Sequence, residues 1–461
     1  MTRLPTRADL ARLAIVARLA IVARFAILAC FATLACFAPG IAHAADDVSA
    51  PTAECPKGVV TLQMLKPQNN PPYKTQLDMF AAANPCIKLD IAEVPFGQLA
   101  DKISVLAAAG KPPDVVVYDG PNTQSYAAFG ILLPLDPYLP AGFKDDVVAA
   151  SLTEHSWDGK LYSPGTQQTT LALFYNADML AKAGIAPPPR ELDKAWTWTQ
   201  AVEAFKKCQQ GEGDNVTVWG LAPSRFGTGT PGFVYRDMLF LRTQGDPKAP
   251  PDSSLYKTYW GISPDGKTAQ GWLNTPEAVA GAQFFQDLFT VAKVTPKAGI
   301  PNAFQDGRAC FTLDTSYFMT GLLNHDPGFK WGVSPLPYSR TPIVHTGSLT
   351  YGVMAKTTHK DEAAKFVVEM STGPIAEDLA RTTNILPVLK SLYPKLPALR
   401  EYPLNIFAEE LQEWGHPRPP SPKFAQYDKI VTDALRDIAY GADPKTRLDE
   451  AVRRLQPILA R

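Results

Sequence analysis

Between residues 59 and 118 the sequence alternates between short apolar runs and amphipathic stretches, and this alternation restricts the fold more than any other feature. β-branched, apolar residues predict strands at 59–65, 87–94 and 114–118. Helical spacing of apolar residues predicts helices at 73–83 and 96–109. Strands and helices in this order form a parallel α/β sheet with right-handed crossovers. Ligands of such sheets bind beyond the carboxyl ends of the strands.

The rest of the chain continues the α/β pattern. Further strands are predicted at 171–175, 216–221, 310–313 and 331–333. Further helices are predicted at 177–183, 198–209, 276–291, 360–370, 374–381, 427–440 and 447–459. Thr197 and Gln200 fit a capping box at the start of one of these helices, and Trp198 between them is expected in the core.

The first 44 residues have the character of a secretion signal. Five arginines lead into an apolar run at 25–37, and Ala42-His43-Ala44 offers small residues where signal peptidase cleaves. We therefore expect cleavage after Ala44 and export to the periplasm. One alternative is a membrane anchor, although the apolar run is shorter than the about 20 residues that span a bilayer. The other is a lipoprotein acylated at Cys30 or Cys36, although leucine stands where a small residue is usual.

The balance of charges argues against a nucleic-acid partner. The chain holds 45 basic and 45 acidic residues, and the first 44 residues account for five arginines and one aspartate. The remainder therefore carries slightly more acidic than basic groups. A mildly acidic surface repels polyanions, so we expect no binding to nucleic acid.

An ordered series of short phrases from about residue 59 to the end resembles the family 1 extracellular solute-binding proteins, which include the maltose-binding proteins. The phrases include Phe80-Ala-Ala-Ala-Asn-Pro85, Pro112-Pro113-Asp114-Val115-Val116, Asp158-Gly-Lys160-Leu-Tyr162, Phe174-Tyr175-Asn176-Ala-Asp178, Gly307-Arg-Ala309-Cys-Phe, Trp331-Gly332-Val-Ser-Pro and Asn384-Ile-Leu-Pro387. Each phrase is weak alone, and their common order carries the resemblance.

The resemblance implies a type II periplasmic-binding-protein fold, with two discontinuous α/β lobes around a central ligand cleft. We expect the chain to cross between lobes near 163–168, 344–348 and 400–414. The N-terminal lobe would then comprise 45–165 with 348–405. The C-terminal lobe would comprise 166–347 with 406–461, and the lobes would close on the ligand by a hinge.

The ligand-contacting residues should lie just past strand ends and at the crossovers, where polar groups can be preset for sugar hydroxyls and aromatic rings for sugar faces. The candidates are Gln68, Asn69, Asn70, Tyr118, Asp119, Gln167, Gln168, Asp314, Tyr317, Gly347, Ser348, Trp414 and Arg418. The resemblance places Tyr317 in a loop that ends in a stacking aromatic residue, and Arg225-Phe226 is a weaker candidate.

Several of these candidates have a second interpretation that the sequence leaves open. The amides at 68–70 could bind ligand or form a turn that uses its own backbone. Asp119 could accept two ligand hydroxyls or cap the following helix. Gly347 could permit close approach of a ligand or only a hinge torsion.

The resemblance implies the periplasmic component of an ABC import system, which delivers a sugar, a mono- or disaccharide, to a membrane permease. The alternative ligand is a glycerol-phosphate diester or a polyol, for which Lys66, Arg225 and Arg418 could supply positive charge. We expect a monomer without cofactor or metal.

The sequence motifs give no support for an enzymatic activity. The sequence has no Gly-x-Ser-x-Gly, His-Glu-x-x-His or phosphate-binding loop, and its histidines do not stand at metal-ligand spacing. A secreted hydrolase or lyase on the same fold is the remote alternative.

Four cysteines follow the predicted signal, at positions 55, 86, 208 and 310. Cys55 and Cys86 precede two strands that are expected to be parallel neighbours in this family. Such strands lie about 4.8 Å apart, within the range that a disulfide bridges. We therefore predict a Cys55–Cys86 disulfide, and we expect Cys208 and Cys310 to remain free.

Overall fold

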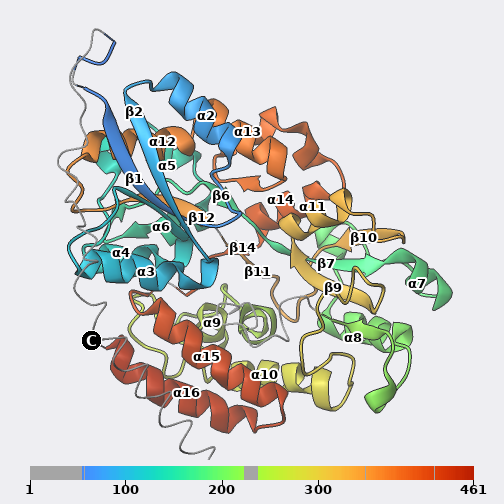
Figure 1. Cartoon of the computed structure of the whole chain (residues 1–461). Helices are drawn as coiled ribbons and strands as arrows, with labels where there is room; N and C mark the ends of the chain where they lie inside the picture. The colour runs from blue at the N-terminus through green and yellow to red at the C-terminus, as the bar shows by residue number, and fades with distance from the viewer. Residues whose placement is uncertain (1–53, 57, 223–236, 348, 420, 461) are drawn as a thin grey trace, which may run out of the picture. The chain divides into compact units, whose positions relative to one another are not determined.

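The computed structural model describes residues 54–56, 58–222, 237–347, 349–419 and 421–460 (Figure 1). The chain divides into two units, Met1–Val48 and Ser49–Arg461. The predicted signal and its cleavage point after Ala44 lie outside the described residues, so the description below concerns the second unit.

The first sheet contains the three predicted strands and one more. It comprises β1 (Val60–Pro67), β2 (Ile87–Val94), β3 (Val115–Asp119) and β12 (Leu349–Val353), in the order β12-β3-β1-β2. β1 pairs in parallel with β2 and β3, as predicted, and β12 is antiparallel to β3. A strand from the far end of the sequence therefore completes this sheet.

Helices cover both faces of the first sheet. Val115 and Val117 of β3 pack with Phe366 and Val367 of α12 (Lys360–Met370). Val116 and Tyr118 belong to a second apolar cluster with helices α3 (Phe96–Ala108) and α4 (Thr123–Ala128). Alternate strand residues point to opposite faces, which explains the division. Tyr118 is therefore a core residue with its ring against Tyr126, at 5.4 Å between centroids.

The second sheet is mixed. It comprises β7 (Leu171–Asn176), β8 (Trp219–Leu221), β9 (Ala309–Thr315) and β10 (Trp331–Ser334), in the order β10-β7-β9-β8. β7 is antiparallel to both of its neighbours, and only β8 and β9 run parallel. β8 is shorter than the predicted 216–221 strand, because Val218 forms an isolated bridge with Gln210 and pairing with β9 begins only at Trp219.

Helices occupy the connections between strands. Their bounds are α2 (Lys74–Ala83), α3 (Phe96–Ala108), α4 (Thr123–Ala128), α5 (Phe143–Asp146), α6 (Ala149–His155), α7 (Ala177–Lys182), α8 (Trp198–Cys208), α9 (Ser254–Trp260), α10 (Pro276–Thr290), α11 (Ser316–Asn324), α12 (Lys360–Met370), α13 (Gly373–Thr383), α14 (Leu404–Glu413), α15 (Phe424–Ala439) and α16 (Pro444–Leu459). Nine of these helices lie close to where the periodicity predicted them, while α4, α5, α6, α9, α11 and α14 were not predicted. No helix in the described ranges is long and apolar enough to cross a membrane.

The capping box at the start of α8 is confirmed. The backbone N–H of Gln200 donates to Oγ1 of Thr197 at 3.3 Å, and the backbone N–H of Thr197 donates to Oε1 of Gln200 at 2.8 Å. These bonds satisfy backbone donors that a helix end otherwise leaves unpaired. Trp198 then enters the core, as predicted, and its indole N–H donates to the Leu239 carbonyl at 2.9 Å.

Three short extended segments lie beside one another. β11 (Val344–His345) pairs with β14 (Gly415–His416), and β6 (Gln167–Gln168) pairs with β13 (Leu386–Pro387). Thr169 and Gly347 exchange both backbone hydrogen bonds, at 2.8 and 3.1 Å. We call 167–170, 344–347 and 415–418 the crossover segments, because they overlap or directly follow the predicted crossings.

Two disulfides are present. Cys55–Cys86 joins the amino ends of β1 and β2, with Cα atoms 5.5 Å apart, as predicted. The expectation that Cys208 and Cys310 stay free is wrong, since they form the second disulfide with Cα atoms 6.3 Å apart. α8 packs on β8 and β9, so its last residue, Cys208, lies over the start of β9.

Candidate functional site

The crossover segments lead directly into strands of both sheets. β3 ends at Asp119 beside Leu349, so the chain enters β12 at the carboxyl end of β3. Leu171, the first residue of β7, pairs with Thr315, the last residue of β9. The segments 167–170 and 344–347 therefore reach these two edges, and the Thr169–Gly347 bonds hold the segments together.

A bidentate ion pair joins the first sheet to the third crossover segment. Nη2 of Arg418 donates to Oδ1 of Asp119 at 2.9 Å, and Nη1 donates to Oδ2 at 3.1 Å. The Arg418 side chain is 3% exposed and that of Asp119 is 26% exposed. Asp119 makes no side-chain capping bond to the turn that follows it, so the capping alternative is not observed.

A buried carboxyl that the sequence did not reveal lies next to this pair. Glu154, on α6, accepts a hydrogen bond from Nε2 of Gln168 at 3.2 Å. Burial raises the pKa of Glu154 to about 8, against the opposing influence of the nearby Arg418 charge. Glu154 is therefore mostly protonated at neutral pH. Its helical context in the sequence gives no signal of this environment.

The first crossover segment contributes two buried amides. Gln167 and Gln168 lie on β6, so their side chains point to opposite sides of the strand. Within the described protein, Oε1 of Gln167, Oε1 of Gln168 and Oε1 of Glu154 have no hydrogen-bond partner. Buried polar atoms without partners are costly. The two glutamine oxygens lack a donor, whereas Oε1 of the protonated Glu154 carboxyl can itself donate, because Oε2 accepts from Gln168.

The loop after β1 forms a turn. Nδ2 of Asn70 donates to the Gln68 carbonyl at 2.7 Å, and Asn69 has a left-handed φ of 56°. This is the turn that the sequence analysis gave as the second interpretation. Lys66, just before it, is buried and pairs with Glu93 at 2.8 Å.

Tyr317 is the exposed aromatic residue at the edge of the second sheet. It lies in the first turn of α11 and is 45% exposed, while Asp314 at the end of β9 is buried. Burial raises the pKa of the Tyr73 hydroxyl, and the neighbouring Tyr317 hydroxyl raises it further through its electrostatic influence and a side-chain hydrogen bond. Tyr317 therefore lies next to Tyr73, the N-cap residue of α2.

Two of the remaining candidates, Trp414 and Gly347, pack against other parts of the protein, which the sequence did not predict. Trp414 is partly buried against the core of the second sheet, with its ring edge-on to Tyr338 at 6.1 Å. A Cβ at Gly347 would overlap the imidazole of His345, so this glycine permits close packing of the protein itself. Ser348 and Arg225-Phe226 lie outside the described residues. The predicted ligand contacts as a whole remain predictions.

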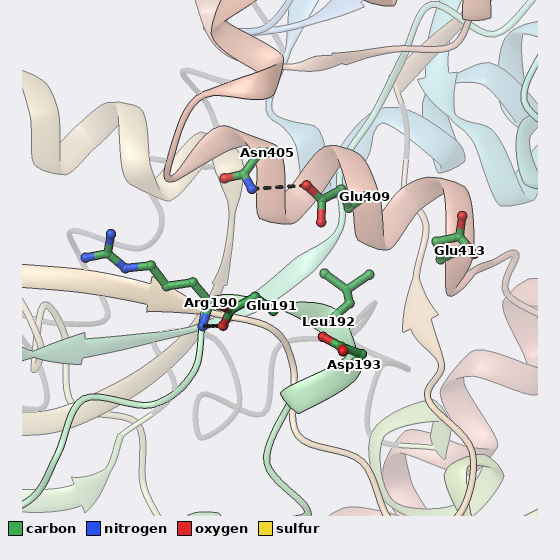
Figure 2. A pocket seen from close by; sticks show the side chains of 7 residues that line it. All are labelled: Arg190, Glu191, Leu192, Asp193, Asn405, Glu409 and Glu413. Carbon is green, nitrogen blue, oxygen red and sulfur yellow. Dashed lines mark hydrogen bonds between the residues drawn. The ribbon is translucent and has the colours of Figure 1, made fainter.

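A separate surface depression of about 480 Å³ lies between residues 190–193 and α14 (Figure 2). Its lining is Arg190, Glu191, Leu192, Asp193, Asn405, Glu409 and Glu413. Nδ2 of Asn405 donates to Oε1 of Glu409 at 3.1 Å, so part of its polar lining is already paired. None of the predicted site residues lines it.

The two sheets, the paired crossover segments and the polar groups at their junction are the features of a solute-binding protein. The chain belongs to the bacterial extracellular solute-binding protein family, whose profile matches residues 75–405. This confirms the resemblance seen in the sequence.

Similar proteins cover nearly the whole chain. A putative binding protein of Brucella abortus (strain 2308) is 21% identical over 421 residues, which are 89% of this chain and 95% of that protein. The maltotriose-binding protein of Pyrococcus abyssi is 23% identical over 414 residues, 87% and 81% of the two chains.

A solved structure confirms the predicted fold class. The ABC transporter solute-binding protein of Thermotoga lettingae TMO, bound with α-D-tagatose, has a TM-score of 0.72 at 19% identity. The match covers 87% of this chain and 99% of that one. The α/β fold is therefore that of the binding-protein class.

Proposed function

We propose that this protein is the exported binding component of an ABC import system, and that it captures an uncharged sugar at the junction of the two sheets. The observation that carries the proposal is the pair of buried polar groups on Glu154 and Gln168, a protonated carboxyl and an amide oxygen, each with an atom that has no hydrogen-bond partner in the described protein. Sugar hydroxyls both donate and accept hydrogen bonds, so they would satisfy both groups, and Tyr317 offers an exposed ring for a sugar face.

The charge at this junction favours a neutral ligand over a phosphate. Arg418 is neutralised by Asp119, and Lys66 by Glu93. Glu154 is mostly protonated at neutral pH because its pKa is about 8. A phosphate ligand needs basic groups that are free to pair with it. The two described cations that the sequence offered for this purpose are both engaged by carboxylates.

The rest of the predicted mechanism is part of the proposal. The lobes would comprise 45–165 with 348–405 and 166–347 with 406–461, and they would close on the ligand about the crossover segments. The closed, monomeric protein would deliver the sugar to a membrane permease without chemical change. The similar protein from Pyrococcus abyssi is a maltotriose-binding protein, and the one from Thermotoga lettingae was solved with tagatose bound. The ligands of these similar proteins therefore run from a monosaccharide to a trisaccharide, and the mono- or disaccharide expected here lies within that range.

Thermal unfolding against a panel of mono-, di- and trisaccharides, polyols and glycerol phosphodiesters tests the proposal. A sugar that binds the folded state should raise the unfolding temperature in a saturable way, by mass action. Calorimetry should then give a one-to-one stoichiometry, and chromatography should recover the sugar unchanged. Stabilisation by glycerol phosphodiesters alone, or turnover of a glycoside, would contradict the proposal.

A further inference from the structure

Arg418 is a buried cation at the edge of the first sheet, and its charge partner comes from another part of the chain. Both carboxylate oxygens of Asp119 accept bonds from its guanidinium. Asp119 is the last residue of β3 and the more exposed partner, so the carboxylate covers the guanidinium on the solvent side.

Two hydrogen bonds from one guanidinium to one anion are the arrangement with which proteins hold the carboxylate, sulfate or phosphate group of a ligand. Here the chain itself supplies the anion. Two further described groups interact electrostatically with Arg418, and neither carries a negative charge at neutral pH that would compensate it. Glu154 is mostly protonated, and burial together with the Arg418 charge lowers the pKa of His345 well below its usual range.

We propose that Asp119 determines the charge specificity of the site, because its carboxylate occupies an anion site built around Arg418 and thereby excludes anionic ligands. The proposal rests on the proposed function, since it places ligand binding at this junction. Removal of the carboxylate would open the site, and a small dianion would then bind in its place.

Glu154 must be controlled in any test of this idea. Asp119 contributes to the raised pKa of Glu154, and Arg418 opposes it. Without Asp119 the Glu154 carboxyl would ionise more easily and could itself neutralise Arg418. Asp119→Ala combined with Glu154→Gln removes both acids. Asp119→Ala alone should bind an anion better at pH 6 than at pH 9, because a larger fraction of Glu154 is protonated at pH 6.

The experiment is thermal unfolding in millimolar sulfate, with chloride keeping the ionic strength constant. Sulfate keeps its charge between these two pH values, so the pH dependence reports on the protein. We expect a saturable stabilisation of Asp119→Ala/Glu154→Gln, with sulfate bound roughly ten- to a hundredfold more tightly than by the wild type. Asp119→Ala/Glu154→Gln/Arg418→Gln is the matched control and should show no saturable response. Asp119→Asn/Glu154→Gln keeps the side-chain volume and replaces the alanine variant in this measurement if that variant does not fold.

Two results would overturn the inference. One is an equal sulfate response in the variants with and without Arg418, because the anion would then bind elsewhere. The other is no saturable response in either folded variant that lacks both acids. Failure of the proposed function has a different signature, since no neutral sugar would then stabilise the wild type, whatever the variants do with sulfate.

Discussion

Replacement of Glu154 by glutamine should make the protein more stable at alkaline pH and leave its stability near pH 4.5 little changed. The folded-state pKa of Glu154 is about 8, against an ordinary value of 4.5. Between these values the unfolded chain releases the proton while the folded chain keeps it, so stability falls as pH rises. At 1.36 kcal/mol for each pH unit, the carboxyl costs at most about 5 kcal/mol by pH 8. Glutamine can still accept the bond from Gln168 and carries no such cost.

Urea unfolding of both proteins between pH 5 and pH 9 measures this effect. The difference in unfolding free energy should grow in favour of Glu154→Gln up to about pH 8 and then level off. The other buried carboxyls and histidines are common to both proteins, so they cancel in the difference. Glu203→Gln, at an exposed position on α8, is the control and should follow the wild type. Parallel curves for Glu154→Gln and the wild type would refute the reasoning.

Further predictions concern the disulfides, the ligand contacts, the signal and the hinge. Serine at both Cys208 and Cys310 should lower the free energy of unfolding by about 4–5 kcal/mol, and serine at both Cys55 and Cys86 by about 3–4 kcal/mol, because the Cys208–Cys310 disulfide closes the longer loop. Urea unfolding measures both losses, and equal losses would contradict this argument from loop length. Tyr317→Ala or Asp119→Ala should weaken sugar binding roughly ten- to a hundredfold in calorimetry; unchanged affinity in both would remove them from the site. Intact mass should place the mature N-terminus at Ala45, unless a lipidated cysteine is found. Small-angle scattering should show a smaller radius of gyration with saturating sugar, and no change would argue against closure on binding.

The sequence predicted local features well and tertiary environments poorly. The bounds of β2 and α12, the capping box of α8 and the Cys55–Cys86 disulfide follow from periodicity and from neighbouring strands of one βαβ unit. Cys208 and Cys310 are 102 positions apart, and only the packing of a helix on a strand brings them together. That packing has no local signature in the sequence.

The candidate site shows the same contrast. Asp119 and Arg418 were both predicted, but nothing in the sequence paired them, since they are 299 positions apart. Glu154 was missed because its burial depends on elements that surround α6. The position of Tyr118 could have been found, because strand alternation puts it on the same face as Val116.

The pairing of the cysteines has a consequence for how the chain acquires its crosslinks. Each disulfide joins cysteines that are consecutive in the described sequence, Cys55 with Cys86 and Cys208 with Cys310. Four cysteines can be joined in three ways, and this arrangement alone contains no interleaved or nested loops. A chain that enters an oxidising compartment N-terminus first, with its leader removed, presents each cysteine with its native partner as the next thiol to arrive. Oxidation in order of arrival therefore yields the native bonds, and thiol–disulfide reshuffling is not required.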